Sequence, residues 1–358
     1  MIPVAPRFTV GRDIEEQKSK VYRRLLQSTF DMRSPSHPPI FIVGCQRSGT
    51  TMLRLMLTAH PDVCIPPESM FFTEMADAFG EGLSQTSQIE ELINRLYKNA
   101  KFREWGVDRS VLYERLVEKV SCSYGQAVSE IYQTYRHLFD SEAERWGDKN
   151  PYHIHRLPVI FRHFPNSNVV HIIRDVRGVF NSHKSRSVLK NWSHLDSNQL
   201  LKSVSDKWNE CIRIHQRYLD DDRVTHLFYE DLVEDPQDVL RKICEAVDLP
   251  YSQEMLHFHE KNREEQLVPS HRREWHEKTF QPIEPDRATA WKDSLSSSEI
   301  EALEILSGDT LTHFGYDLKT TSPRLRGYLF LFSNSVSNHM SHRVTDLVNY
   351  FAEKNSSA

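Results

Sequence analysis

A short stretch near the start of the chain combines residue types that bind phosphate. An apolar run begins near Ile40, followed by Gly44-Cys45-Gln46-Arg47-Ser48-Gly49-Thr50-Thr51 and then an amphipathic pattern. A strand, a glycine turn and a helix in this order point backbone N–H groups and a partly positive helix N-terminus at an anion. The glycine spacing is that of a P-loop, but Thr50 stands where the lysine of an ATP-binding loop would lie. We therefore predict a site for a different phosphate ester, with Arg47 as a permanently charged ligand.

A second basic cluster follows another apolar run at residues 168–173. Arg174 and Ser182 lie eight residues apart across the start of a predicted helix, and Arg177, Lys184 and Arg186 add charge. A solvated basic helix face is the alternative. Two anion sites, each following a parallel strand, would suit a nucleotide with phosphates at both ends of its ribose.

The elements that position these residues are predicted from the same patterns. A third apolar strand at 224–229 precedes Asp235-Pro236, a pair typical of a helix start. Alternating strands and helices predict an α/β fold, with a mostly parallel central sheet flanked by helices and ligands beyond the strand ends. Residues 69–145 have a helical pattern rich in aromatic residues and could roof a cleft. Pro66-Pro67 enforces an extended backbone before Glu68, which predicts a rigid loop there.

These motifs together resemble those of PAPS-dependent sulfotransferases. Residues 44–51 are similar to that family's 5′-phosphosulfate loop, and 171–182 to its 3′-phosphate motif. Further similar segments are 146–151, 229–236 and 289–292, in the family's order. The resemblance covers about residues 38–318 and implies the P-loop sulfotransferase fold. It divides the chain into an N-terminal arm (1–37), a sulfotransferase domain (38–318, with 69–145 as a helical acceptor-side layer) and a C-terminal helical extension (319–358).

The resemblance also implies roles for single residues. The pattern is similar to a bacterial branch that resembles the tyrosylprotein sulfotransferases, in which an acidic residue after an HPDV-like segment is the general base. That residue is Glu68; the histidine base and full R-K-G ending of small-molecule enzymes are not evident. Arg47 and Lys149 would stabilise charge on the transferring group. The cofactor-binding residues would be Arg47, Ser48, Gly49, Thr50, Thr51 and Thr289 at the 5′ end, Arg174 and Ser182 at the 3′-phosphate, and Tyr229 at the adenine.

The reaction implied is transfer of a sulfuryl group from PAPS to a hydroxyl, releasing adenosine 3′,5′-bisphosphate. No metal is required, because fixed cations can carry the charge that Mg²⁺ neutralises in kinases. The alternatives are a P-loop kinase and a catalytically silent nucleotide-binding protein. The sequence does not identify the acceptor, which could be a small molecule, a sugar or a lipid. The aromatic residues in 69–145 favour an apolar alcohol, whereas the His- and Arg-rich stretch 257–276 would suit a polar acceptor. The alternative for 257–276 is a polar surface segment.

Composition argues against several functional and structural classes of protein. The 358 residues include 45 Lys+Arg and 50 Asp+Glu, and the net charge of −5 argues against a nucleic-acid partner. Five cysteines without a C-x-x-C pair favour neither a disulfide framework nor a zinc ribbon, and we expect a cytoplasmic protein without a transmembrane segment. Residues 15–28 predict a charged helical arm. Residues 344–351 predict a helix with one apolar face, which would pack on its own domain or form a homo-oligomer interface.

Overall fold

A five-stranded parallel sheet lies at the centre of the computed structural model, which describes residues 37–139, 142–189, 197–320, 327–329 and 331. The strand order is β2-β3-β1-β4-β5. The strands are β1 (Ile40–Gly44), β2 (Val63–Cys64), β3 (Arg145–Lys149), β4 (Asn168–Ile173) and β5 (Val224–Phe228). The predicted α/β fold with a parallel sheet is therefore confirmed.

The central strand β1 has hydrophobic partners on both faces of the sheet. Ile40 and Ile42 belong to one hydrophobic core, and Phe41 and Val43 belong to the other. This double burial explains why β1 is an unbroken apolar run without polar alternation. Since β1 and β4 are paired in parallel, the loops that follow them leave the same edge of the sheet. The topology thus makes the two predicted anion-binding motifs neighbours.

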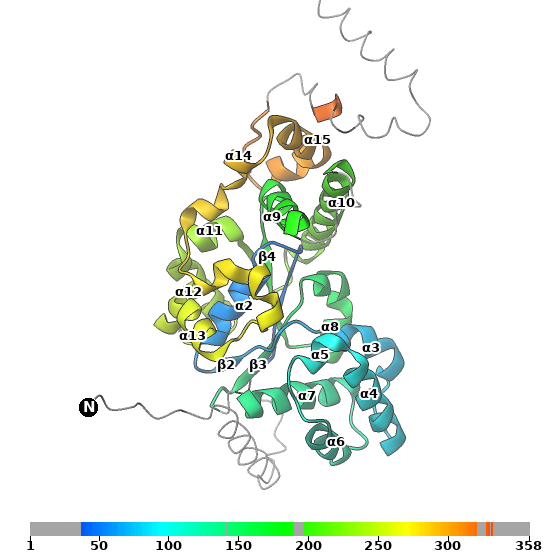
Figure 1. The fold of residues 1–358 in the computed structure, drawn as a ribbon. Coiled ribbons are helices and arrows are strands. Elements are labelled where there is room, and N and C mark those ends of the chain that lie inside the picture. Colours follow the sequence, from blue (N-terminus) through cyan, green and yellow to red (C-terminus); the bar gives the residue numbers. More distant parts are fainter. Residues whose placement is uncertain (1–36, 140–141, 190–196, 321–326, 330, 332–358) are drawn as a thin grey trace, which may run out of the picture.

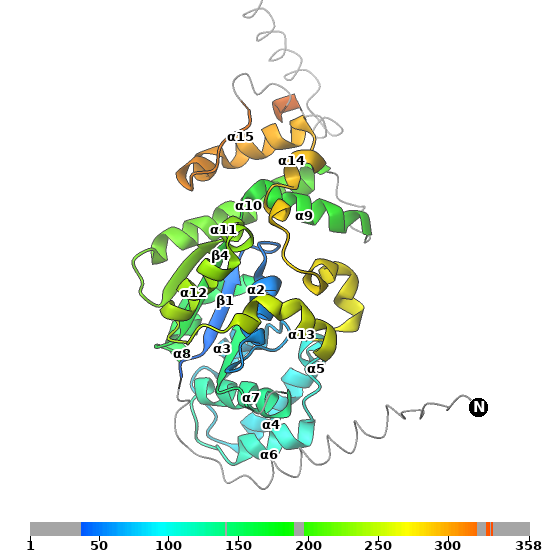
Figure 2. The ribbon, with the colours of Figure 1, turned by 90° about the vertical axis from the view of Figure 1, so that its left-hand side faces the viewer.

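Helices cover both faces of the sheet (Figures 1 and 2). One face carries α2 (Thr50–Ala59), α11 (Tyr229–Glu234), α12 (Pro236–Ala246), the 3₁₀ helix η3 (Gln253–His257) and α13 (Phe258–Glu265). The other carries α8 (Leu157–His163), α9 (Val176–Leu189), α10 (Ser197–His215) and α15 (Ser297–His313). The remaining short elements are the 3₁₀ helices η1 (Pro151–Arg156), η2 (Gln216–Tyr218), η4 (Ser270–Phe280) and η5 (Pro285–Ala288), and the helix α14 (Trp291–Ser294).

The segment between β2 and β3 forms a helical layer at one end of the molecule, opposite α14 and α15 (Figures 1 and 2). Its helices are α3 (Phe71–Phe79), α4 (Thr86–Lys98), α5 (Ala100–Arg103), α6 (Arg109–Val117) and α7 (Tyr124–Phe139). Most of its aromatic side chains are buried against one another: the ring centroid of Trp105 lies 5.7 Å from that of Phe71 and 5.2 Å from that of Tyr132. These rings form core rather than a binding surface, so they no longer favour an apolar acceptor.

Some predictions concern residues beyond the described part of the chain. The N-terminal arm with its helix at 15–28, the apolar helix at 344–351 and most of the 319–358 extension lie outside the described residues. Within the described ranges, no helix is both long and apolar enough to cross a membrane. All five cysteines are free thiols.

Candidate functional site

The loop from β1 to α2 has the backbone geometry of an anion cradle. Arg47 (φ 71°) and Gly49 (φ 99°) both lie in the left-handed region, which is rare for a residue with a side chain such as Arg47. Gly49 is the N-cap of α2 and has no side chain with which to cap the first-turn N–H groups. A Cβ at Gly49 would lie 2.5 Å from Cδ2 of Tyr229. Glycine is therefore needed both for the turn and for the close approach of the Tyr229 ring.

The two predicted phosphate-binding motifs are in direct contact. Nε of Arg47 donates a 3.0 Å hydrogen bond to Oγ of Ser182. Nη1 of Arg174 donates to the carbonyl oxygen of Arg47 at 3.1 Å, and its Nη2 donates to that of Arg287 at 3.2 Å. The Arg174 guanidinium also lies 4.0 Å from the centroid of the Tyr229 ring. The loops that follow β1, β4 and β5 therefore form one connected unit.

One donor of Arg174 still lacks an acceptor. Its Nε is buried and has no hydrogen-bond partner among the described residues. A Cβ at position 178 would lie 2.8 Å from this Nε, so Gly178 on α9 leaves the space that the guanidinium needs. A buried charged donor without an acceptor is costly, and an anionic oxygen of a ligand would satisfy it. Arg174 thus fits the phosphate-binding role expected from the sequence.

These residues line a cleft of about 420 Å³. Seven of the predicted cofactor-binding residues contribute to it: Arg47, Gly49, Thr50, Thr51, Arg174, Ser182 and Tyr229. Of the described residues predicted for this site, Ser48 and Thr289 do not line the cleft; Ser48 is buried, and Thr289 is exposed beside Ala290, which does line it.

The cleft also has a wall that the sequence did not predict. Residues 274–279 of η4 line it, including Trp275, His276 and Lys278. Residues 274–276 end the His- and Arg-rich stretch that we expected on the surface or near the acceptor, and residues 277–279 follow it; all of them lie beside the glycine loop instead. An aromatic ring next to a lysine was the available signal, since bases stack on rings and phosphates bind cations.

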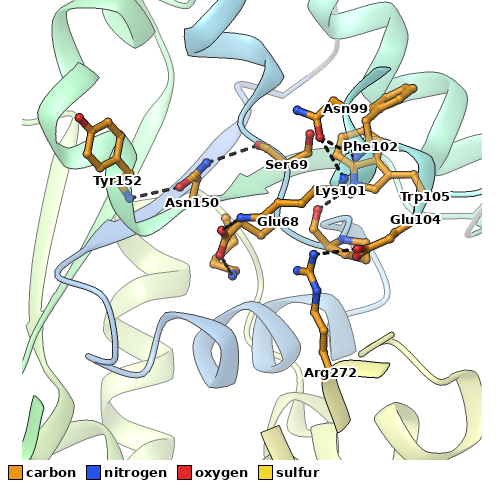
Figure 3. Close-up of polar contacts among 12 residues, drawn as sticks. Glu68, Ser69, Asn99, Lys101, Phe102, Glu104, Trp105, Asn150, Tyr152 and Arg272 are labelled. Atoms are coloured by element: carbon orange, nitrogen blue, oxygen red, sulfur yellow. Dashed lines mark hydrogen bonds and ion pairs between the residues drawn. The ribbon is translucent and has the colours of Figure 1, made fainter. Parts of the chain in front are cut away.

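Glu68 lies between two lysines (Figure 3). Its Oε1 is 2.5 Å from Nζ of Lys101, and its Oε2 is 3.0 Å from Nζ of Lys149. Lys149, at the end of β3, is buried, and Glu68 is partly buried. Nε1 of Trp105 donates a 2.8 Å hydrogen bond to the carbonyl oxygen of Pro67, which fixes the loop before Glu68. The predicted partners Glu68 and Lys149 are therefore together, whereas Lys101 on α5 was not anticipated from its sequence context.

The two lysines determine the protonation state of Glu68. Burial by itself would raise the pKa of this carboxyl group, but the charges and hydrogen bonds of Lys149 and Lys101 outweigh burial and hold the pKa well below its usual range. Burial lowers the pKa of Lys149, and the charge of Glu68 offsets part of that shift. Glu68 is thus a carboxylate at physiological pH, and its basicity depends on how closely the two ammonium groups stay.

Two other basic residues of the predicted cluster form ion pairs with carboxylates outside the cleft. Arg177 is buried, pairs with Asp175 at 2.7 Å and Glu304 at 2.6 Å, and lies over the ring of Trp291. Lys184 pairs with Glu299 at 2.8 Å. The side chain of Arg186 lies outside the described part of the chain. Of these basic residues, Arg174 is the one that lines the cleft, while Arg177 and Lys184 attach α9 to α15.

The cleft and the Glu68 cluster are linked through η4. Arg272 precedes the cleft-lining residues of η4 and pairs with Glu104 at 2.8 Å. Glu104 follows α5, the helix that carries Lys101. Figure 3 shows the Arg272–Glu104 pair beside the Lys101–Glu68 pair. The helices between β2 and β3 and this wall of the cleft are therefore joined at Glu104, which pairs with Arg272 and also lies 3.3 Å from Nε2 of His271.

The parallel sheet, the glycine loop and the arginine-lined cleft define an α/β P-loop protein with an anion-binding site. A family model described as "Sulfotransferase family" matches residues 38–253, which is more than half of the chain. The chain therefore belongs to the sulfotransferase family, and the class predicted from its motifs, a PAPS-dependent sulfotransferase, is confirmed.

Curated relatives share this family. A putative protein-tyrosine sulfotransferase of Caenorhabditis briggsae is 29% identical over 287 residues, which is 79% of this chain and 91% of that protein. The protein-tyrosine sulfotransferase of Drosophila melanogaster is 25% identical over 293 residues, covering 80% of this chain and 53% of the relative. This chain thus spans about half the length of the fly protein and nearly all of the nematode one.

Solved structures show the same fold. The sulfotransferase domain of the Synechococcus PCC 7002 olefin synthase has a TM-score of 0.55 at 21% identity and covers 81% of this chain and 98% of that domain. The sulfotransferase domain from the curacin biosynthetic pathway has a TM-score of 0.52 at 19% identity and covers 80% of this chain and all of that domain. At these identities the likeness establishes the fold alone.

Proposed function

We propose that this protein transfers the sulfuryl group of PAPS to a hydroxyl group of an acceptor, with Glu68 as the general base. The observation that supports the proposal is that the two predicted anion-binding motifs meet in one cleft, where Arg47 contacts Ser182 and Arg174 contacts the Arg47 carbonyl oxygen. PAPS has phosphates on both sides of its ribose and needs two such sites. A single-phosphate P-loop would not require the second.

The described residues suggest a division of tasks within the cleft. The uncapped N–H groups at the start of α2 and the hydroxyls of Thr50 and Thr51 would bind the 5′-phosphate. Arg174, with its free Nε, and Ser182 would bind the 3′-phosphate. Tyr229 and Trp275 offer aromatic faces for the adenine. Arg47 would add positive charge beside the phosphosulfate, whereas Ser48 and Thr289 do not line the cleft and are assigned no contact.

The catalytic proposal rests on Glu68 and Lys149. The carboxylate of Glu68 would accept the proton of the acceptor hydroxyl, and the ammonium group of Lys149 would stabilise negative charge on the leaving phosphate. If Lys149 turns from Glu68 to a bound phosphosulfate, Glu68 loses one counter-charge and its pKa rises. Cofactor binding would thus make Glu68 a stronger base at the moment when it is needed.

The proposed acceptor carries a hydroxyl group. The curated relatives named above are protein-tyrosine sulfotransferases, so a tyrosyl hydroxyl is the first acceptor to test. The buried aromatic rings of α3–α7 give no support to an apolar pocket in that layer. Small-molecule, sugar and lipid alcohols remain the other arms of an acceptor panel.

A binding titration followed by a transfer assay tests this function. Calorimetry should show binding of adenosine 3′,5′-bisphosphate that is tighter than binding of 5′-AMP and needs no Mg²⁺. Incubation with PAPS and the panel, with EDTA present, should then release adenosine 3′,5′-bisphosphate with one acceptor. Preferred binding of Mg-ATP would support a kinase instead, and tight bisphosphate binding without transfer to any acceptor would support a silent nucleotide-binding protein.

A further inference from the structure

Three histidines from different elements meet beside the sheet. His171 lies in β4, His226 lies opposite it in the parallel register of β5, and His215 ends α10. One ring nitrogen from each lies within 4.8 Å of the other two. The closest pair is Nδ1 of His215 and Nδ1 of His226, at 2.9 Å. We call His171, His215 and His226 the histidine cluster.

One histidine of the cluster has an unsatisfied nitrogen. His171 is 1% exposed, and its Nδ1 has no hydrogen-bond partner among the described residues. Buried polar atoms almost always have a partner, because an unpaired one loses its bond to water without compensation. A ligand that reaches this nitrogen would remove this deficit.

A second histidine has the outer hydrogen bond that metal-binding imidazoles use. Nε2 of His226 lies 3.1 Å from the carbonyl oxygen of Tyr218, which can only accept. Nε2 therefore carries the proton, and Nδ1 presents its lone pair toward His215. Metal-binding histidines commonly donate their other N–H to a carbonyl in this way, which fixes the ring and its tautomer.

The surroundings favour neutral imidazoles, the form that binds metal. The ring centroid of Phe314 lies 5.2 Å from that of His215 and 5.9 Å from that of Phe228. Burial, with repulsion between the rings for His171 and His215, lowers the pKa of all three histidines. Three imidazoles without a carboxylate suit zinc, cobalt, nickel or copper rather than magnesium or calcium.

We propose that His171, His215 and His226 bind one divalent transition-metal ion through three imidazole nitrogens, with zinc as the expected occupant. Zn–N bonds of about 2.0–2.1 Å place tetrahedral ligand atoms about 3.3 Å apart. The Nδ1 atoms of His215 and His226 are 2.9 Å apart, and the other ligand atoms lie within 4.8 Å, so the rings must shift by up to about 1.5 Å on binding. Binding requires the proton between the two Nδ1 atoms of His215 and His226 to leave; His215 then carries its proton on Nε2. The fourth position stays open to water.

The histidine cluster lies close in sequence to two residues that line the cleft. His171 precedes Arg174 by three residues, and His226 precedes Tyr229 by three residues. The helix of His215 also contacts this region, because Nε1 of Trp208 donates to the carbonyl oxygen of Arg174 at 2.8 Å. An ion at the cluster would tie β4, β5 and α10 together directly behind the Arg174–Tyr229 pair. It would stabilise the 3′-phosphate side of the cleft without touching the nucleotide.

The first test uses the full chain without a histidine tag, treated with EDTA and dialysed. Titration with Co²⁺ should produce a visible absorption spectrum that saturates at one ion per chain, and Zn²⁺ should abolish it. Zinc should also raise the thermal unfolding temperature. Absence of a saturable one-ion spectrum in the wild-type protein would overturn the proposal without any variant.

Variants then assign the ligands. We expect His171→Gln to weaken Co²⁺ binding at least about tenfold and to lose the rise in unfolding temperature. The matched control is His257→Gln, since His257 is an exposed histidine elsewhere whose ring centroid lies 6.4 Å from that of the buried His259. Equal loss in both variants, or full binding in His171→Gln, would contradict the assignment. Metal binding is measured without PAPS, so its failure would leave the proposed sulfuryl transfer untouched.

Discussion

Two cationic regions of this protein differ in the groups that contact their positive charges. In the cleft, the hydrogen-bond acceptors of Arg174 are backbone carbonyls, and its Nε is left for a ligand. At Glu68, one carboxylate already occupies the ammonium groups of both Lys101 and Lys149. The charge of Arg174 is thus held by neutral acceptors, whereas the charges of Lys101 and Lys149 are paired with a carboxylate.

This difference predicts separate effects on cofactor affinity and on turnover. A guanidinium fixed by neutral groups loses little when an anion binds, because no ion pair has to break. In the proposed reaction, Lys149 would give up part of its interaction with Glu68 before it stabilises a leaving group, and that same change would raise the pKa of Glu68. Changes in the cleft should therefore affect affinity, and changes at Glu68 should affect turnover.

Removal of the Glu68 charge is expected to have the largest effect. Glu68→Gln should reduce kcat about 10²- to 10⁴-fold, because the amide cannot accept the acceptor proton. Calorimetry should show unchanged affinity for adenosine 3′,5′-bisphosphate. The control is Glu104→Gln, which breaks the nearby pair with Arg272 and should retain turnover. Wild-type kcat in Glu68→Gln would refute the base assignment.

The opposite pattern is expected at Arg174. Arg174→Ala should weaken binding of adenosine 3′,5′-bisphosphate about 10- to 150-fold, the loss of a charged hydrogen-bonding group worth about 1.5–3 kcal/mol. Binding of 5′-AMP should change much less. Arg223 is a suitable control, because it also lies over a ring, that of Phe161, but precedes β5 at the other edge of the sheet. Equal losses for the two nucleotides would argue against a 3′-phosphate role.

Substitution of Gly49 should weaken binding of adenosine 3′,5′-bisphosphate through a steric clash, without a change in charge. Gly49→Ala would place a Cβ 2.5 Å from the Tyr229 ring at a φ of +99°, so we expect about tenfold weaker bisphosphate binding and a less stable fold. Gly315→Ala is the matched control: it has the same kind of backbone, φ +76°, with nothing within 4 Å. It should lower stability only, and equal nucleotide affinity in both variants would count against the close-contact argument.

The smallest expected effect is a change in pH dependence. Lys101→Met removes one of the two charges that depress the pKa of Glu68, so this pKa should rise. Since the base works only when ionised, the acid limb of kcat/KM should move to higher pH, with little change near neutrality. Lys98→Met, on the exposed end of α4, should leave the profile unchanged. A shift to lower pH, or none, would show that Lys101 does not influence the catalytic carboxylate.

The local motifs were predictable because their chemistry is contained in a few consecutive residues. The apolar run of β1, the glycines of its loop and the basic residues after β4 are each read from adjacent positions, and the parallel sheet brings them together as expected. The described residues of α3 to α7 are mostly helical, as the pattern of residues 69–145 predicts, but sequence pattern does not distinguish a buried ring from one that lines a cleft. Their aromatic residues are core because they cover one end of the sheet.

The sequence by itself therefore determined the fold class, the phosphate loop and the candidate base, since each depends on short-range order along the chain. The tertiary structure alone decided which charges meet. Lys101 reaches Glu68 from 33 residues away, η4 forms a wall of the cleft, and three separate histidines converge on one point. Such contacts depend on how the helices pack against the sheet, which no spacing within the sequence records.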